Sequence, residues 1–123
     1  MDAIKEIIDS YGYESAETME LGDNIEVDAD GFMPLVIEKC GENHLSVAHY
    51  YEQRGDLMRD PEIVFSLADG EWTPFEFRQD PAFHQYDKDG LDIGPFLKQW
   101  NSNIRKQGFV DAAAEAQANQ EGR

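Results

Sequence analysis

The densest group of residues with chemical potential lies in residues 45–65, "LSVAHYYEQRGDLMRDPEIVF". Two alternating apolar runs flank a charged connector, residues 52–62, that contains four carboxylates. Carboxylates are hard oxygen ligands of the kind that Mg²⁺ and Ca²⁺ prefer. Arg54 and Arg59 oppose cation binding in the same stretch, however, and no imidazole lies at a known ligand spacing. The pattern therefore predicts no metal site and no cofactor.

Three interpretations of the connector remain open. It is a long hairpin loop held by pairs of arginine and carboxylate with a turn at Asp60–Pro61, or a partner-binding surface, or one wall of a ligand or catalytic pocket. Catalysis would require carboxylates that converge in a cleft with separated pKa values. The candidate partner-binding residues are Glu52, Gln53, Asp56, Arg59, Asp60, Glu62, Arg78 and Asp80.

No other part of the sequence supplies a recognisable catalytic group. His44, His49 and His84 are isolated, and no serine or cysteine occupies an identifiable nucleophile turn. His49 shares a predicted strand face with Leu45 and Val47, which indicates a core or boundary histidine. We therefore predict no catalytic residue, and a non-enzymatic role is favoured.

Cys40 is the single cysteine, so an intramolecular disulfide is excluded and a reducing, intracellular setting is favoured. Its neighbours in "VIEKCG" predict a strand in which the thiol packs as a small apolar group. The N-terminal "MDAIKEIIDS" lacks the features of a secretory signal, and no apolar run approaches the roughly 20 residues that span a bilayer. We expect a cytoplasmic protein.

Negative charge dominates the composition. The net charge is −16, and residues 1–30 hold ten acidic groups against one lysine. Such a balance argues against direct binding to nucleic acid or an anionic membrane, because phosphate recognition relies on clustered Lys and Arg. We expect a basic protein partner. The predicted acidic surface consists of Glu14, Glu17, Glu20, Asp23, Glu26, Asp28 and Asp30.

The 123 residues suit one domain, which we place at 1–109 with a flexible tail or weak helical extension at 110–123. Helical spacing predicts helices at 2–11 and 95–107, and residues 13–30 are predicted as mostly loop. Alternation predicts strands at 31–41, 44–51, 62–67 and 71–79. The expected fold is α+β, a four-stranded antiparallel meander with N- and C-terminal helices packed on one face.

Four stretches of the sequence form distinctive motifs. The most distinctive is "HYYEQRGDLMRDPE" within residues 45–65, and the others are "GFMPLVIE" (31–38), "WTPFEFRQD" (72–80) and "FLKQWNSNIRKQGF" (96–109). These stretches resemble an uncharacterised domain family carried on phages, plasmids and conjugative elements, domain of unknown function 6908. The resemblance implies an accessory module of mobile DNA and no established activity.

Together these observations favour a non-enzymatic interaction protein whose acidic surface binds a basic protein that handles nucleic acid. The alternative is a small enzyme, or a ligand or metal binder, that uses the carboxylate-rich connector at 52–62.

Overall fold

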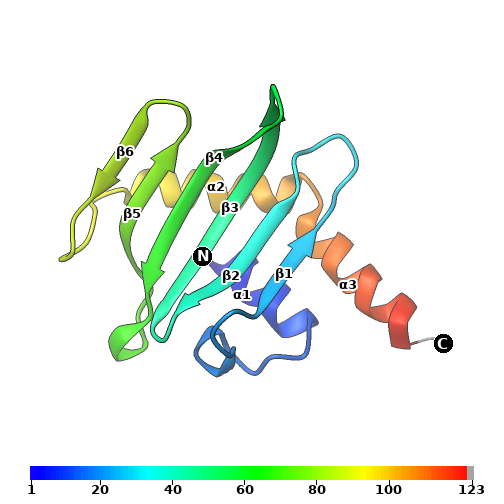
Figure 1. The fold of residues 1–123 in the computed structure, drawn as a ribbon. Coiled ribbons are helices and arrows are strands. Elements are labelled where there is room, and N and C mark those ends of the chain that lie inside the picture. Colours follow the sequence, from blue (N-terminus) through cyan, green and yellow to red (C-terminus); the bar gives the residue numbers. More distant parts are fainter. Residues whose placement is uncertain (122–123) are drawn as a thin grey trace.

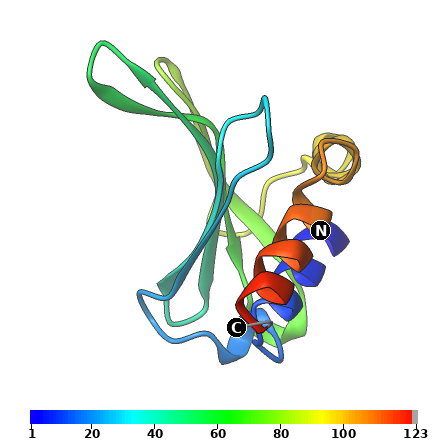
Figure 2. The same cartoon turned by 90° about the vertical axis from the view of Figure 1, so that its right-hand side faces the viewer.

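The computed structural model describes residues 1–121, which form a sheet layer and a helix layer (Figure 1). The helices are α1 (Asp2–Ser10), α2 (Gly94–Lys106) and α3 (Phe109–Glu121). The strands are β1 (Asn24–Val27), β2 (Leu35–Gly41), β3 (His44–Gln53), β4 (Asp56–Ser66), β5 (Thr73–Gln79) and β6 (Phe83–Tyr86). Each strand pairs antiparallel with the next in the order β1-β2-β3-β4-β5-β6. All three helices lie on one face of the sheet (Figure 2).

The α+β class and the antiparallel meander are confirmed, but the predicted number of strands is wrong. The sheet has six strands rather than four, and the two additional strands, β1 and β6, form its edges. β1 alternates for only four residues inside an acidic stretch, and all four residues of β6 are exposed. The apolar alternation of β1 is limited to Ile25 and Val27, and β6 has no buried residue, so neither strand is long enough or apolar enough to stand out in the sequence.

The core lies between the sheet and the helices, as the predicted periodicities require. Alternate residues of β2, β3 and β4 face the helices, and the stripe on α2 buries Trp100 and Ile104. The buried strand residues are Leu35, Ile37, Leu45, Val47, Ile63 and Phe65, and α1 contributes Ala3, Ile4, Ile7 and Ile8. Trp100 retains 5 % exposure, as expected for the apolar side of the helix predicted at 95–107.

The C-terminal segment forms α3, which lies beside α1 (Figure 2). Phe109 and Ala113 of this helix are buried. Of the predicted tail at 110–123, residues 122–123 lie outside the described part. Within residues 1–121, no helix is both long enough and apolar enough to cross a membrane.

Lys39 orders the N-terminal segment that the sequence pattern indicated as mostly loop. Its side chain is 2 % exposed on the helix-facing side of β2. The ammonium group donates to the carbonyl oxygens of Ala16 at 2.8 Å, Glu17 at 3.2 Å and Met19 at 3.1 Å. These carbonyls belong to a short 3₁₀ helix, Ala16–Thr18, and the residue that follows it. The acidic segment, residues 13–30, is thereby fixed against the core.

We expect Lys39→Met to lower the free energy of unfolding by about 2–4 kcal/mol, because it removes the charged donor from three inward-facing carbonyls. Chemical denaturation measures the loss, and hydrogen exchange should increase first in residues 14–20. Lys98→Met, at an exposed lysine of α2, is the control and should change stability little. Equal stability of both variants would show that the lysine does not hold the segment.

Candidate functional site

The charged connector is a tight β-hairpin and not the long loop that we predicted. β3 runs to Gln53, β4 begins at Asp56, and these two residues are paired across the turn. Arg54 and Gly55 form the two-residue turn, with φ of 54° and 85°. Left-handed backbone at both positions is what a type I′ hairpin turn requires. The hairpin bends away from the helix layer and projects beyond the rest of the sheet, so Glu52 is exposed near its tip (Figure 2).

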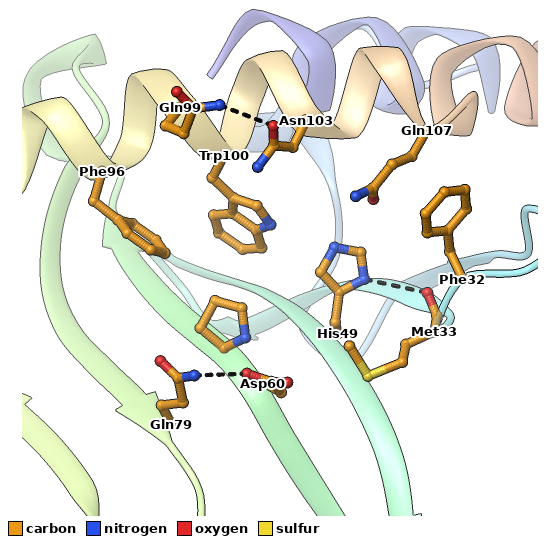
Figure 3. A pocket seen from close by; sticks show the side chains of 11 residues that line it. Phe32, Met33, His49, Asp60, Gln79, Phe96, Gln99, Trp100, Asn103 and Gln107 are labelled. Carbon is orange, nitrogen blue, oxygen red and sulfur yellow. Dashed lines mark hydrogen bonds between the residues drawn. The ribbon is translucent and has the colours of Figure 1, made fainter.

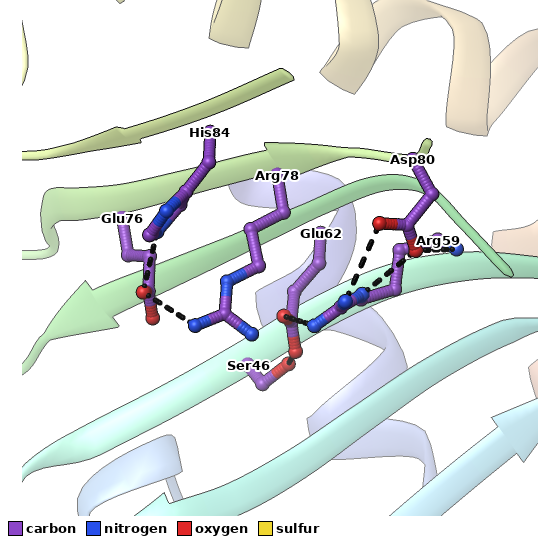
Figure 4. Close-up of polar contacts among 7 residues, drawn as sticks. All are labelled: Ser46, Arg59, Glu62, Glu76, Arg78, Asp80 and His84. Atoms are coloured by element: carbon purple, nitrogen blue, oxygen red, sulfur yellow. Dashed lines mark hydrogen bonds and ion pairs between the residues drawn. The ribbon is translucent and has the colours of Figure 1, made fainter. Parts of the chain in front are cut away.

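Part of the predicted set meets farther down the same strands, on the sheet face opposite the helices (Figure 4). Asp80 Oδ2 accepts hydrogen bonds from the Arg59 backbone N–H at 2.8 Å and from Arg59 Nε at 3.0 Å. Arg59 Nη1 lies 3.7 Å from Glu62 Oε1. Glu62 Oε2 accepts a hydrogen bond from the Ser46 hydroxyl at 2.7 Å.

A second group extends this network towards β6. Arg78 Nη2 and His84 Nε2 each lie 2.9 Å from Glu76 Oε2 (Figure 4). Burial alone would raise the pKa of Glu76, but the hydrogen bonds and charges of His84 and Arg78 outweigh it and lower that pKa. Hydrogen bonds from Arg59 lower the pKa of Asp80. The sheet-face network, defined as Ser46, Arg59, Glu62, Glu76, Arg78, Asp80 and His84, therefore holds paired charges.

The structure thus brings together only half of the eight predicted partner-binding residues. Arg59, Glu62, Arg78 and Asp80 join the sheet-face network, whereas Glu52, Gln53 and Asp56 lie at the exposed hairpin tip. Asp60 is held separately, because its Oδ1 accepts from Gln79 Nε2 at 2.8 Å. Within the described residues, no three His, Cys, Asp or Glu side chains are placed to hold a metal ion.

The predicted acidic surface is exposed and ordered. Asp23 is half-buried and accepts hydrogen bonds from the Tyr13 hydroxyl at 3.2 Å and the Glu20 N–H at 2.9 Å. The other six carboxylates are exposed, namely Glu14, Glu17, Glu20, Glu26, Asp28 and Asp30. Among residues 1–121, the ion pairs include no carboxylate of the acidic segment. The segment therefore presents its negative charge to solvent.

A groove lies beside this segment on the uncovered sheet face, and the sequence pattern did not reveal it. We call it the open-face groove; its volume is about 510 Å³. Its lining residues are Glu26, Met33, Pro34, Val36, Tyr50, Tyr51, Glu52 and Leu57. Leu57 is 65 % exposed, so it adds apolar contact area to the groove. In the sequence, the adjacent tyrosines Tyr50 and Tyr51 were the feature that could have indicated this groove.

A second pocket lies between α2 and the helix-facing side of the sheet (Figure 3). This α2 pocket has a volume of about 280 Å³ and is lined by Phe32, Met33, His49, Asp60, Pro61, Gln79, Phe96, Gln99, Trp100, Asn103 and Gln107. The prediction of His49 as a core or boundary histidine is confirmed, since the residue is 6 % exposed. Burial lowers its pKa, so the ring is neutral near pH 7. The four carboxamides of the lining, Gln79, Gln99, Asn103 and Gln107, could not be predicted from the sequence, because Asn and Gln follow no periodic pattern.

Cys40 departs from its predicted position. It does lie in a strand, β2, but its side chain is exposed on the sheet face opposite the helices. Partial desolvation raises the pKa of its thiol, and the nearby carboxylates of Glu38, Glu62 and Glu76 raise it further. A raised pKa disfavours the thiolate, so the surroundings give no activated nucleophile.

These features define a small two-layer α+β domain that has a groove on one face of its sheet and a pocket on the other. The chain belongs to the family described as Domain of unknown function (DUF6908), whose model matches residues 2–110. No curated protein and no solved structure matches the chain.

We expect Asp80→Asn to lower the free energy of unfolding near pH 7 by about 1–2 kcal/mol, because it weakens a charge-assisted pair with Arg59. The native pKa of Asp80 is below its ordinary value near 4. Its stabilisation is therefore complete above that ordinary value and is lost as the pH falls through the native pKa.

Urea denaturation at several pH values measures this effect. The difference between the parent and Asp80→Asn should be present at neutral pH and shrink in acid. Asp56→Asn, at the exposed hairpin tip, should cost little at any pH. If Asp80→Asn lowered the free energy of unfolding by the same amount at every pH, the ion pair between Asp80 and Arg59 would be contradicted.

Proposed function

We propose that this domain is a non-enzymatic accessory protein of a mobile genetic element that binds a basic, nucleic-acid-handling protein. The binding surface comprises the open-face groove and the adjoining acidic segment. The observation that carries the proposal is the composition of the groove, whose only two charged lining residues, Glu26 and Glu52, are both acidic.

The groove offers an apolar floor with a negative rim. Tyr50, Tyr51 and Leu57 supply contact area on the projecting hairpin, and tyrosines combine a large ring with a polar tip. A partner segment with an apolar side chain flanked by lysine or arginine complements both features. The exposed carboxylates of the acidic segment extend this field beyond the rim and speed association with a basic partner.

Order in the acidic segment favours specific recognition over a general effect of charge on solubility. Lys39 holds the backbone of Ala16, Glu17 and Met19, so the nearby carboxylates project from a fixed chain. Binding to a preformed surface avoids the entropy cost of ordering it. The mobile-element context and the nucleic-acid-handling nature of the partner are further parts of the proposal. They are supported by the resemblance of residues 45–65 and by the net charge of −16.

The test compares two variants of equal net charge. The first replaces six exposed carboxylates by amides and consists of Glu14→Gln, Glu17→Gln, Glu20→Gln, Glu26→Gln, Asp28→Asn and Asp30→Asn. The matched control consists of Asp9→Asn, Glu42→Gln, Glu71→Gln, Asp89→Asn, Asp92→Asn and Glu115→Gln, all exposed positions outside the acidic segment and the open-face groove. Both variants change the net charge from −16 to −10.

A partner captured from the native host at low salt should bind the first variant at least tenfold more weakly than the control, and added nucleic acid should compete with the parent. Equal affinities of the two variants would show that binding depends on net charge and not on the acidic segment. Simultaneous binding of nucleic acid and this domain to the partner would contradict the proposed competition.

The groove is tested separately by Leu57→Ser. We expect capture to weaken by about tenfold while the melting temperature stays nearly constant, because the side chain is already exposed. Surface plasmon resonance with the captured partner measures the change. An unchanged affinity would remove the groove from the interface and leave only the acidic segment.

A further inference from the structure

The deep end of the α2 pocket contains a buried hydrogen-bond donor without an acceptor. Trp100 is 95 % buried, and its Nε1 has no hydrogen-bond partner among residues 1–121. In Figure 3 the indole nitrogen lies on the edge of the ring that faces His49. A buried N–H without a partner is destabilising. Nε1 has almost no accessible surface, so a ligand reaches this donor only when the indole ring turns towards the pocket.

His49 supplies the complementary acceptor. Its Nδ1 lies 3.2 Å from the carbonyl oxygen of Met33, which can only accept, so Nδ1 carries the hydrogen. In the neutral ring this leaves Nε2 with a free lone pair. Figure 3 shows that nitrogen turned towards Trp100 and the α2 helix. The ring centroids of His49 and Trp100 are 5.8 Å apart, which places the donor and the acceptor at the same end of the pocket.

Aromatic side chains surround the pocket and remain partly uncovered. Phe96, on α2, is 38 % exposed, and Phe32, before β2, is 47 % exposed. The Phe96 and Trp100 ring centroids are 6.1 Å apart, so the two residues form a continuous aromatic wall. Uncovered ring faces favour stacking with a flat ligand.

The remaining lining groups select against anions. Asp60 is the only charged side chain of the lining, and one of its oxygens is bonded to Gln79. A carboxylate here repels phosphate and other anions, as does the net charge of −16. The carboxamides of Gln99, Asn103 and Gln107 can each donate and accept. An uncharged ligand with both donors and acceptors is the best match.

We propose that the α2 pocket binds a neutral, planar heterocycle with an N–H beside a carbonyl, the lactam edge found in uracil and hypoxanthine bases. The carbonyl accepts from Trp100 Nε1, the N–H donates to His49 Nε2, and the ring packs against the aromatic wall. A volume of about 280 Å³ is just below the roughly 300–1,000 Å³ typical of drug-sized ligands, which suits one or two fused rings. This inference does not rest on the proposed protein partner, and the two sites share only Met33 among their lining residues.

The test uses Trp100 as its own reporter. Trp72→Phe removes the only other tryptophan, so fluorescence then arises from the pocket alone. Uridine and inosine, which present the lactam edge without a phosphate, should change this fluorescence saturably at about 10 µM to 1 mM, with matching heats in calorimetry. 3-Methyluridine has the same ring but lacks the N–H, so it should bind at least tenfold more weakly. Uridine 5′-monophosphate should also bind more weakly than uridine.

Two variants identify the groups responsible. His49→Phe keeps a ring at this position but removes the acceptor, so uridine and 3-methyluridine should bind it with equal, weak affinity. Phe96→Leu, at a partly exposed position, should weaken both nucleosides several-fold through lost stacking and remains informative if His49→Phe does not fold. The proposal is overturned if neither uridine nor inosine saturates the parent, or if 3-methyluridine binds the parent as tightly as uridine.

Discussion

The ammonium group of Lys39 lies inside the protein, where three backbone carbonyls replace its water shell. A buried charge without such partners would be strongly destabilising. The same three bonds satisfy the carbonyls at the end of the 3₁₀ helix, Ala16–Thr18. One interaction therefore joins β2 to the chain that leads into β1. Backbone hydrogen bonds from the Gly22 N–H to the Lys39 carbonyl and from the Lys39 N–H to the Asp23 carbonyl, both 2.9 Å, hold the acidic segment to the same strand.

The sheet separates two kinds of surface because successive residues of a strand point to opposite faces. His49 of β3 faces the helices and belongs to the α2 pocket, whereas its neighbour Tyr50 belongs to the open-face groove. The helices exclude water from the first face. A polar group there that has no protein partner, such as the Trp100 indole N–H, therefore has no water to replace it. The second face is solvated. Arg59 and Arg78 pair with carboxylates in the sheet-face network, whereas Glu26 and Glu52 of the open-face groove form no ion pair among residues 1–121.

Sequence periodicity predicted the elements with a buried face, such as the alternation around Val47 and the helical stripe that contains Trp100. It did not predict β1, whose apolar pattern is only Ile25 and Val27 within an acidic stretch, or β6, which has no buried residue and pairs only with β5. The hairpin tip looked like a loop because its residues are charged, although Arg54–Gly55 suits a two-residue turn. The α2 pocket was hidden because its lining comes from five separate parts of the chain, and only the fold brings these parts together.

β1 ends the sheet, so the backbone N–H and C=O groups along its outer side have no neighbouring strand. Such an edge is a template on which another copy of the chain can add a strand and begin aggregation. Glu26 projects from this strand, and Asp28 and Asp30 follow it directly. A second copy that approaches edge to edge carries the same carboxylates and is repelled. The acidity of this segment therefore protects this edge of the sheet, and that protection weakens where high salt screens the repulsion.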